Sequence, residues 1–481
     1  MGYRDLQAFI SALEQRSQLV RVKAEVDHHL EITEIVDRVS KAGGPALLFE
    51  NVKDSPYPLL INAFGSNERM CLALGVKSLD DIGAVIGNFF EMSNYSGMVN
   101  KIRSLPRLAR LATVFPLKVP SAPCQEVVEH APDLSTLPVL TCWPGDGGPF
   151  VTLPLVITRD PETGLQNMGM YRLQVYDRNT TGMHWHVHKD GRSMYERYKA
   201  AGVLRMPVSV ALGGDPATIY SATAPLPPEI NEMMLAGFLR KMPLEIVKCK
   251  TNELYVPARA EFILEGYVDT QEDLREEGPF GDHTGYYSLK GMFPVFHVEC
   301  ITRRKNPVYP ATVVGKPPME DCWLGKATER IFLPILRAQL PEIVDMHFPL
   351  EGVFHNCLIV SIRKRYPGHA RKVMHALWGM GQMMYTKMIV VVDEQISPAD
   401  ISTVAWKVFN NIDAARDLVV VDGPLDELDH ASPLPRFGHK LGVDATRKWP
   451  EEGHLREWPE DVCMTPEIKR QVDRRWEEYG L

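Results

Sequence analysis

The sequence has 481 residues, a net charge of -8 and a composition of 45% hydrophobic and 24% charged residues. This length predicts about two or three domains. The composition is typical of a soluble globular protein and has no basic excess that would indicate a nucleic-acid partner. The eight cysteines are scattered without a C-x-x-C pair, which predicts reduced thiols in a cytoplasmic protein. No stretch approaches the roughly 18 apolar residues of a membrane span.

Residues 1–105 are expected to form a small α/β domain. Asp5 can cap a helix whose apolar residues recur at the helical period, and Leu19–Val26 alternates like a strand. Similar patterns predict a helix from Ile32 to Gly43, strands at 46–49 and 59–63, and helices at 67–75 and 78–93. Several prolines mark residues 106–124 as a linker.

Residues 125–315 change to short strands separated by turns. They predict a mainly β domain, a barrel with helical insertions. The expected strands lie at 151–158, 168–176, 208–212, 245–249, 262–268 and 293–301.

Residues 316–450 alternate strands with helices and predict a second α/β domain. Strands are expected at 358–363, 388–392 and 418–421, and helices at 368–379 and 399–411. Ser397 is expected to cap the second of these helices, with Pro398 at its first position. The charged tail, 451–481, is expected to contain a helix at 467–478 that packs on a neighbour.

The stretch Glu277-Gly278-Pro279-Phe280-Gly281-Asp282-His283 places two carboxylates five residues apart around a Gly-Pro-Phe-Gly run. This run predicts a turn, because neither helix nor strand accommodates it. Two acids on one turn, with an arginine nearby, can carry out tuned proton transfer. A plain surface turn that carries two acids is the alternative.

The stretch Asn167-Met168-Gly169-Met170-Tyr171-Arg172 supplies a candidate arginine. The planar guanidinium fork suits a carboxylate ligand, although Arg172 could equally form a structural salt bridge with Glu277. Asn167 and Arg172 are an odd number of residues apart, so an unbroken strand would place them on opposite faces. Either Gly169 marks a bulge or the two residues serve different neighbours.

His184, His186 and His188 occupy alternate positions, so an extended segment would place all three imidazoles on one face. Such a face suits a metal or a phosphate, but it is also compatible with solvated surface. Oxygen ligands would complete a metal site, and Asn167 and Glu232 are the candidates. An Asn, His and Glu set favours manganese or magnesium over zinc.

The sequence contains no P-loop, no convincing G-x-G-x-x-G and no G-x-S-x-G elbow. The residues alone therefore predict an acid–base site, with a candidate metal centre, in the β-rich middle domain. They do not specify a reaction.

At these motifs the chain resembles the UbiD family of decarboxylases, which use prenylated flavin mononucleotide (prenylated FMN). The resemblance extends over almost the whole chain. Besides the two stretches above it includes Gly44-Pro45-Ala46-Leu47-Leu48-Phe49-Glu50-Asn51, Thr141-Cys142-Trp143-Pro144, Tyr309-Pro310-Ala311-Thr312 and Leu441-Gly442-Val443-Asp444-Ala445-Thr446-Arg447-Lys448-Trp449-Pro450.

The resemblance implies an N-terminal α/β domain, a central flavin-binding split β-barrel and a C-terminal α/β oligomerisation domain. It implies that Asn167, His188 and Glu232 hold Mn²⁺ or Mg²⁺ beside the flavin phosphate. Main-chain oxygens around 221–224 would bind K⁺. The segments lining the cofactor would contain Met170, Tyr171, Arg172, His184, Trp185, His186, Lys189 and Asp190, with Lys387 as a further phosphate ligand.

By the same resemblance Arg172, Glu277 and Asp282 form the catalytic network. Arg172 would orient the substrate carboxylate, Asp282 would return a proton to the carbon that loses carbon dioxide, and Glu277 would support Arg172 and relay protons. Burial of Asp282 beside Glu277 is expected to raise the pKa of Asp282. Aspartate at this position, where the cinnamic-acid branch has glutamate, favours a substrate that is a hydroxylated aromatic acid.

Two quinone-pathway substrates fit this branch: a polyprenyl 4-hydroxybenzoate for ubiquinone and a naphthoate intermediate for menaquinone, to which residues 180–186 point. Other hypotheses are a catabolic aromatic-acid decarboxylase or carboxylase, and a flavin-binding redox or cofactor-maturation protein without decarboxylase activity. The family also implies a cytoplasmic homo-oligomer, a dimer or a hexamer, that receives its cofactor from a prenyl-flavin synthase. A polyprenyl substrate would add peripheral contact with a membrane.

Overall fold

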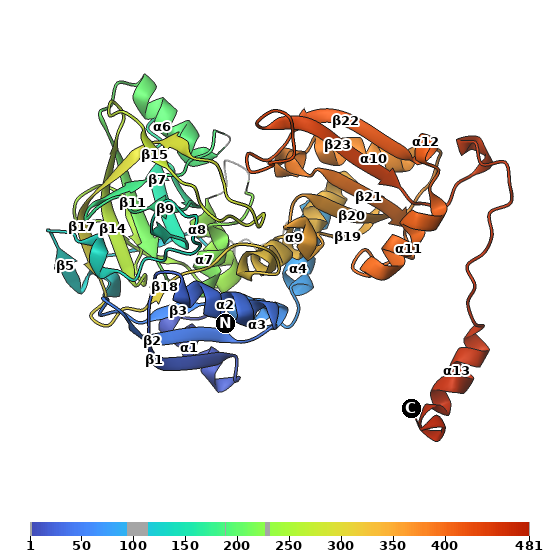
Figure 1. Ribbon diagram of the computed structural model, residues 1–481, viewed down its shortest axis with the longest axis horizontal. Helices are drawn as coiled ribbons and strands as arrows, with labels where there is room; N and C mark the ends of the chain where they lie inside the picture. Colours follow the sequence, from blue (N-terminus) through green and yellow to red (C-terminus); the bar gives the residue numbers. More distant parts are fainter. Residues whose placement is uncertain (1, 94–113, 188, 227–230, 481) are drawn as a thin grey trace, which may run out of the picture.

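The structure is a computed structural model that describes residues 2–93, 114–187, 189–226 and 231–480. Its elements form three parts that follow one another along the chain (Figure 1). The N-terminal and central parts pack together, and the C-terminal part lies beside them. The long helix α9 (Glu320–Gln339) begins beneath the central part and leads into the C-terminal part, with α4 (Asp80–Ser93) packed along it.

The N-terminal part is a mixed sheet covered by helices, with strand order β1-β2-β3-β18. Asp5 caps the first helix as predicted, because its carboxylate accepts a hydrogen bond from the Ala8 N–H. The fourth strand, β18 (Tyr309–Pro310), comes from much later in the chain and pairs in parallel with β3. The other elements are α1 (Leu6–Gln15), β1 (Leu19–Val26), α2 (Glu31–Lys41), β2 (Ala46–Val52), β3 (Leu59–Ile61) and α3 (Asn67–Leu74).

The central part contains an antiparallel sheet of order β10-β17-β14-β11-β7-β8, with β5 also paired to β17. Smaller sheets, β13-β12-β4, β15-β16 and β6-β9, flank it. The strands are β4 (Leu117–Val119), β5 (Val127–Glu129), β6 (Phe150–Val151), β7 (Pro154–Arg159), β8 (Gln166–Met170), β9 (Leu173–Gln174), β10 (Thr180–Gly182), β11 (Arg205–Leu212), β12 (Glu245–Lys248), β13 (Tyr255–Pro257), β14 (Phe262–Asp269), β15 (Arg275–Glu277), β16 (Gly291–Phe293) and β17 (Val295–Arg303). The helices are η1 (Pro123–Gln125), η2 (Leu134–Thr136), α6 (Asp190–Ala200), α7 (Pro216–Ser221) and α8 (Glu232–Arg240).

The expected barrel is not closed in the part of the chain that the structure describes. Strand β8 pairs with β7 on one side only. On its other side the Met168 N–H donates to Glu232 Oε2 (2.9 Å) and the Met170 N–H to the Ala222 carbonyl (3.0 Å). Because helices α7 and α8 occupy the edge of β8, another strand cannot pair there. The central sheet is therefore open at the edge that carries Asn167.

The C-terminal part is a five-stranded mixed sheet of order β19-β20-β21-β23-β22 with helices around it. Its helix α11 begins after Asp400, whose side chain accepts from the Thr403 N–H, so the predicted cap at Ser397 is wrong by one turn. The remaining elements are β19 (Ile343–His347), η3 (Leu350–Gly352), β20 (Cys357–Ile362), α10 (His369–Trp378), η4 (Gly381–Tyr385), β21 (Met388–Asp393), α11 (Ile401–Asn411), α12 (Ala414–Asp417), β22 (Leu418–Pro424), β23 (Phe437–Asp444), η5 (Pro450–Glu452), α13 (Pro466–Arg474) and η6 (Trp476–Tyr479).

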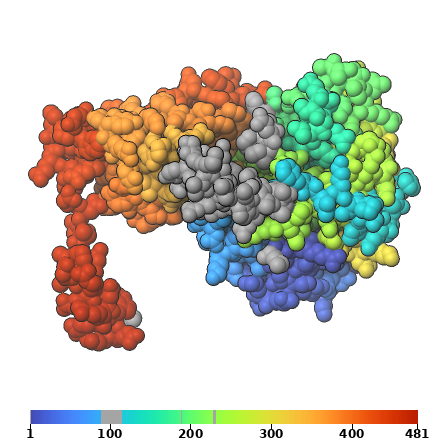
Figure 2. All heavy atoms as spheres, turned by 180° about the vertical axis from the view of Figure 1, so that it is seen from behind, coloured from blue at the N-terminus to red at the C-terminus, as the bar shows by residue number. Residues whose placement is uncertain are grey.

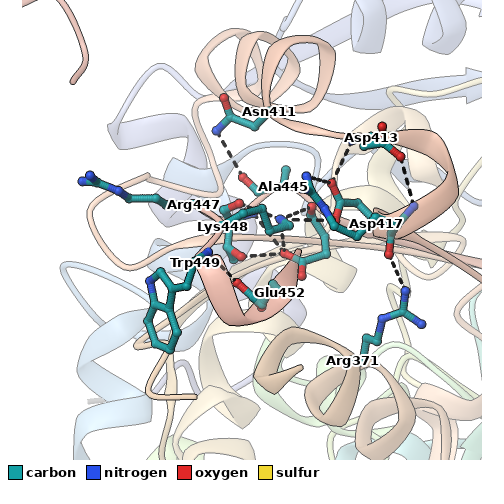
Figure 3. Close-up of polar contacts among 12 residues, drawn as sticks. Arg371, Asn411, Asp413, Asp417, Ala445, Arg447, Lys448, Trp449 and Glu452 are labelled. Atoms are coloured by element: carbon teal, nitrogen blue, oxygen red, sulfur yellow. Dashed lines mark hydrogen bonds and ion pairs between the residues drawn. The ribbon is translucent and has the colours of Figure 1, made fainter. Parts of the chain in front are cut away.

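A buried ion cluster forms where β23 ends (Figure 3). The side chain of Lys448 is 1% exposed, and its ammonium donates to the carbonyls of Asp444 (2.8 Å) and Thr446 (2.6 Å) and to Asp444 Oδ1 (3.0 Å). Nearby, Lys364 donates to the Arg447 carbonyl (2.8 Å) and to Glu452 (2.5 Å). These contacts hold the segment that follows β23 against the sheet.

The hydrophobic core is not divided at the boundaries between the three parts. One cluster joins Leu6 and Phe9 of α1 to Leu155 of β7 and to Ala327 and Ile331 of α9. The chain beyond η5 leaves the body as a separate arm (Figure 2), and none of the residues of α13 is buried. Among the described residues, no helix combines the length and apolar character that crossing a membrane requires.

Candidate active site

Arg172 lies at the centre of a buried cluster of acids. It follows β8 at the break before β9, where an unbroken strand was predicted. Its Nε and Nη2 donate to the two carboxylate oxygens of Glu277 (2.9 and 3.1 Å), and its Nη1 donates to Asp282. The side chain of Glu277 is fully buried and that of Asp282 is 10% exposed. The two sequence motifs therefore meet in one site.

The turn between the two acids is held by residues from other segments. Gln174 Oε1 accepts from the Gly278 N–H (2.7 Å), and Asp146 Oδ1 accepts from the Gly281 N–H (2.7 Å). Gly281 lies so close to Trp143 that a Cβ at this position would be 2.1 Å from the indole ring. The turn thus has one permitted shape, which directs both carboxylates toward Arg172.

Two aromatic rings and a hydroxyl complete the surroundings of the arginine. Its guanidinium lies 4.7 Å from the ring centroid of Phe280 and 5.8 Å from that of Phe150. Ser288 Oγ lies 3.0 Å from its Nη2. These contacts fix the plane of the guanidinium, and a fixed plane is what paired recognition of a carboxylate requires.

A pair of histidines lies behind each acid. His184 Nδ1 is 2.9 Å from Glu277 Oε2, and its Nε2 is 2.5 Å from His186 Nε2. These two alternate histidines do lie on one face, as the sequence predicted. His283 Nδ1 is 3.0 Å from Asp282 Oδ1, and its Nε2 is 2.8 Å from the Nε2 of His355, which belongs to the C-terminal part.

The charge of Arg172 governs the ionisation of both acids. Burial by itself would raise the pKa of each carboxyl. Hydrogen bonds from His184 and Arg172, together with the arginine charge, outweigh burial and lower the pKa of Glu277 to about 2. The Arg172 charge and the hydrogen bond from His283 likewise hold the pKa of Asp282 well below its ordinary value. The expected rise in the pKa of Asp282 is therefore wrong for the ligand-free site.

Asn167 and Glu232, two of the three predicted metal ligands, lie next to each other at the edge of β8. Glu232 begins α8 and accepts from the N–H of Met168, the residue after Asn167. Burial raises the pKa of Glu232 to about 7. One side-chain amide atom of Asn167 is buried without a partner among the described residues. His188, the third predicted ligand, lies outside the described residues.

This donor set fits a divalent ion. A bound cation would neutralise the buried Glu232 carboxylate, and Asn167 could offer it the amide oxygen as a ligand; the unpartnered atom of Asn167 is the Nδ2 donor, which a cation would not satisfy. Within the described part of the chain, no group of three His, Cys, Asp or Glu side chains could hold a metal, so the amide and the undescribed His188 would be needed. Residues 221–224, which were expected to bind K⁺ through main-chain oxygens, lie at the C-terminal end of α7. There the Ala222 carbonyl accepts a hydrogen bond from the Met170 N–H.

The residues predicted to line the cofactor do not all lie beside Arg172. Met170 and Tyr171 are half-buried beside Arg172. Trp185 is 1% exposed and packs in the core against Tyr195 of α6, with its indole N–H unpartnered among the described residues.

The charged candidates lie at the border between two parts. Lys189 precedes Asp190, the first residue of α6, and lines a cleft of about 480 Å³. The opposite wall of this cleft comes from the C-terminal part, including Trp378 and Pro424. Lys387 instead makes an ion pair with Asp429 (2.7 Å).

Sequence reasoning missed several residues that touch the site, because they come from distant segments. Asp146 and Gln174 shape the turn, His355 contacts His283, and the buried Asp321 faces His283 from the start of α9. The motif Thr141-Cys142-Trp143-Pro144 was a usable signal, since Asp146 and Trp143 belong to the same loop.

Comparison with known proteins identifies the family. Three models of the 3-octaprenyl-4-hydroxybenzoate carboxy-lyase family match: the N-terminal domain at residues 10–86, the Rift-related domain at 117–317 and the C-terminal domain at 322–445. The chain therefore belongs to the UbiD family and is a carboxy-lyase. Two relatives, described as uncharacterized, are a protein of Archaeoglobus fulgidus with 52% identity over 99% of both chains and one of Aquifex aeolicus with 48% identity over 100% of this chain and 99% of its own.

Solved structures of the same class share the fold. Vanillic acid decarboxylase of Sedimentibacter hydroxybenzoicus in its closed form has a TM-score of 0.85 and 28% identity, covering 100% of this chain and 99% of its own. HmfF of Pelotomaculum thermopropionicum, a UbiD-class enzyme in complex with FMN, has a TM-score of 0.81 and 27% identity, covering 97% and 98%. An evolved dimeric form of HmfF, in complex with prenylated FMN, has a TM-score of 0.79 and 26% identity over the same shares.

Proposed function

We propose that this protein is a prenylated-FMN-dependent, non-oxidative decarboxylase of a hydroxyaryl carboxylic acid. One observation carries the proposal: the guanidinium fork of Arg172 is shared between Glu277 and Asp282, which lie on one turn. Such a fork can bind a substrate carboxylate with two parallel hydrogen bonds, and each acid can hold or release a proton beside it.

Substrate binding would change the charge balance of the cluster. Arg172 pairs with both acids in their ionised form, so the three groups together carry one net negative charge. A third carboxylate, brought by the substrate, would compete for the same guanidinium, and the repulsion among like charges would raise the pKa of Asp282. Asp282 would then take up a proton. It would thereby become the acid that protonates the carbon from which carbon dioxide leaves, while Glu277 keeps Arg172 in position.

Prenylated FMN, when bound, would supply the electron sink that decarboxylation of an aromatic ring requires. Residues Met170 to Arg172 and the His184–His186 segment would line it, and Asn167, His188 and Glu232 would hold Mn²⁺ or Mg²⁺ beside its phosphate. Lys189 and Asp190 would also line the cofactor, Lys387 would be a further phosphate ligand, and main-chain oxygens at 221–224 would bind K⁺. The complexes of HmfF with FMN and prenylated FMN support the choice of flavin cofactor.

The descriptions of similar proteins point to the substrate class. A similar structure is described as a vanillic acid decarboxylase, which makes an aromatic acid the first class to test. The family name refers to a 3-octaprenyl-4-hydroxybenzoate, a quinone precursor. We therefore propose a role in quinone biosynthesis, with the polyprenyl 4-hydroxybenzoate and the menaquinone-pathway naphthoate as the two candidates.

The domain organisation that we propose for the chain is that of the UbiD family. The boundaries would be 1–105, 125–315 and 316–450, with a linker at 106–124 and the tail at 451–481. Two pairings between the described strands cross them, since β4 of the linker pairs with β12 and β18 completes the N-terminal sheet. The working form would be a cytoplasmic homo-oligomer, loaded by a prenyl-flavin synthase.

Co-expression with a prenyl-flavin synthase tests the proposal directly. The purified protein is expected to carry a flavin whose mass and visible spectrum identify prenylated FMN, to contain manganese, and to release carbon dioxide from hydroxylated aromatic acids. A loaded protein that releases none from hydroxybenzoates, catechol acids or naphthoates would contradict the proposal and favour a redox or maturation role. Flotation with liposomes in the presence of a polyprenyl acid would show whether a membrane supplies the substrate.

A further inference from the structure

A hydrogen-bonded pair of histidines connects Asp282 to the C-terminal part of the chain. His283 Nδ1 lies 3.0 Å from Asp282 Oδ1, and His283 Nε2 lies 2.8 Å from His355 Nε2. His355 belongs to the segment between η3 and β20, and its neighbour Phe354 lies against the His283 ring with centroids 5.0 Å apart. The two rings therefore form a continuous path from the acid to the other side of the boundary between the parts.

The other oxygen of Asp282 is already occupied. Asp282 Oδ2 accepts from Arg172, whereas Oδ1 accepts from both the N–H and the ring of His283. The side chain of Asp282 is only 10% exposed. A proton that reaches this carboxylate without passing through Arg172, which stays charged, has to arrive at Oδ1. In the described part of the chain, the ring donor at Oδ1 is His283.

The far end of the pair has unused hydrogen-bonding capacity. His355 Nδ1 is buried without a partner among the described residues. At the other end of the pair, Asp321 of α9 faces His283, and its Oδ2 is likewise unpartnered there. Burial raises the pKa of Asp321 to about 7. Buried polar atoms are rarely left unpaired, so atoms of this kind mark a place where a proton or a water is exchanged.

The charges around the pair favour a proton on the ring nearer to the acid. Burial opposes a charge on His283, but its contact with Asp282 outweighs burial and raises the pKa of His283. Asp321 and Asp426 also face it. Burial and the charge of His283 lower the pKa of His355 to about 4, although Asp426 and Asp429 oppose this and Lys189 adds to it. A proton that enters at His355 is thus drawn toward Asp282.

We propose that His355 and His283 form a proton relay that delivers to Asp282 the one proton that each turnover consumes. The inference rests on the proposed function of Asp282 as the acid. Each decarboxylation converts a carboxylate and one proton into carbon dioxide and a C–H bond, so the site consumes one proton per cycle. In the relay the Nε2–H bond of protonated His355 breaks as a bond forms to His283 Nε2, while the Nδ1–H bond of His283 breaks as an O–H bond forms on Asp282. Both histidines act through Asp282 and do not touch the substrate.

Variants of His355 separate a relay from a structural contact. His355→Gln keeps a hydrogen bond to His283 but cannot pass a proton, and His355→Ala opens a space for free imidazole. His375→Gln, at an exposed position of α10, is the matched control. Thermal unfolding of the cofactor-free proteins is expected to be similar for His355→Gln and wild type.

In the loaded enzyme we expect His355→Gln to lower kcat by about 10²-fold with little change in KM. The first turnover should still release one carbon dioxide per site at the wild-type rate, because carbon dioxide leaves before the proton returns. Imidazole should restore at least part of the turnover of His355→Ala. In the cofactor-free protein, ¹⁵N NMR should show that the titration of His283 changes in His355→Gln and not in His375→Gln.

Three outcomes separate a failure of the proposed relay from a failure of the proposed decarboxylase function. If wild type releases no carbon dioxide, the proposed function fails, and the role of the relay fails with it. If wild type is active and His355→Gln has an unchanged kcat and pH profile, the relay alone is wrong. If the initial burst slows together with the steady state and imidazole restores nothing, His355 has a structural role only.

Discussion

The central and C-terminal parts each bury an ion cluster, and the two clusters differ in their partners. Around Lys448 the closest acceptors are mainly main-chain carbonyls, which cannot change their protonation state. Around Arg172 the acceptors are the carboxylates of Glu277 and Asp282, with imidazoles behind them. Burial costs similar desolvation in both places. The acceptors around Lys448 therefore hold one protonation state, whereas the acids and histidines around Arg172 can exchange protons.

The largest expected effect lies in the Arg172 cluster. Glu277→Gln removes one charge that holds the arginine, and we expect carbon dioxide release by the loaded enzyme to fall by about 10²- to 10⁴-fold. Glu276→Gln is the matched control, because the neighbouring Glu276 is exposed and pairs with Lys290 on the surface. Equal activity of both variants would remove Glu277 from the catalytic network.

The next effect concerns stability in the Lys448 cluster. Lys448→Met leaves the buried carboxylate of Asp444 without its cation, so we expect the free energy of unfolding to fall by about 3–5 kcal/mol. Arg447→Met, at a 47% exposed side chain paired with Glu460, should cost less than about 1 kcal/mol. Denaturant unfolding measures both. A small loss for Lys448→Met would mean that the cluster has no greater structural role than a surface pair.

A pH titration separates the two clusters further. Because the pKa of Glu277 is lowered from 4.5 to about 2 in the folded state, its stabilising contribution is complete above about pH 4.5. It is lost as the pH falls toward 2. Unfolding of wild type and Glu277→Gln between pH 2 and pH 6 should therefore converge at the acid end of the range. Parallel curves would show that the folded protein does not hold this carboxylate in its ionised form.

The smallest effect is expected where the arm leaves the body. Lys407 of α11 is buried and makes an ion pair with Asp461 (2.6 Å), whose side chain is 53% exposed. Asp461→Asn should lower the free energy of unfolding by less than about 1 kcal/mol, because solvent screens the exposed partner. It should not change carbon dioxide release. Proteolysis of the arm would report whether this contact holds it; an unchanged cleavage rate would assign that role to other residues.

The sequence was informative where structure is local. The cap at Asp5 and most helices and strands follow from periodicity, because side-chain spacing decides which face is buried. Strand 168–176 was predicted as continuous, but it breaks at Tyr171 and Arg172, since Arg172 turns to meet acids more than a hundred residues away. The β-rich middle domain was predicted correctly, but its sheet does not close into a barrel among the described residues. At the edge of β8, α7 and α8 take the hydrogen bonds that a further strand would need.

The site itself was only partly predictable. Glu277 and Asp282 stand out in sequence because of the turn between them, Arg172 was a candidate for its guanidinium, and the family resemblance assigned the three residues to one network. His355 carried no such signal, since its contact with His283 depends on how two parts of the chain pack. The pKa of Asp282 was predicted in the wrong direction. The burial of this carboxyl could be expected from the motif, but its close contact with the charge of Arg172, which is distant in sequence, could not.

Strand β18 can complete the N-terminal sheet only late in synthesis, because it lies at residues 309–310. The edge of β3 is covered only when Tyr309 and Pro310 pair with it. During synthesis on the ribosome, that edge therefore stays open until the whole central part has been made, and an open edge can pair with other chains. Fragments that end before Tyr309 should aggregate more readily than the full chain. A useful truncation of this protein has to keep Tyr309 and Pro310 together with the N-terminal sheet.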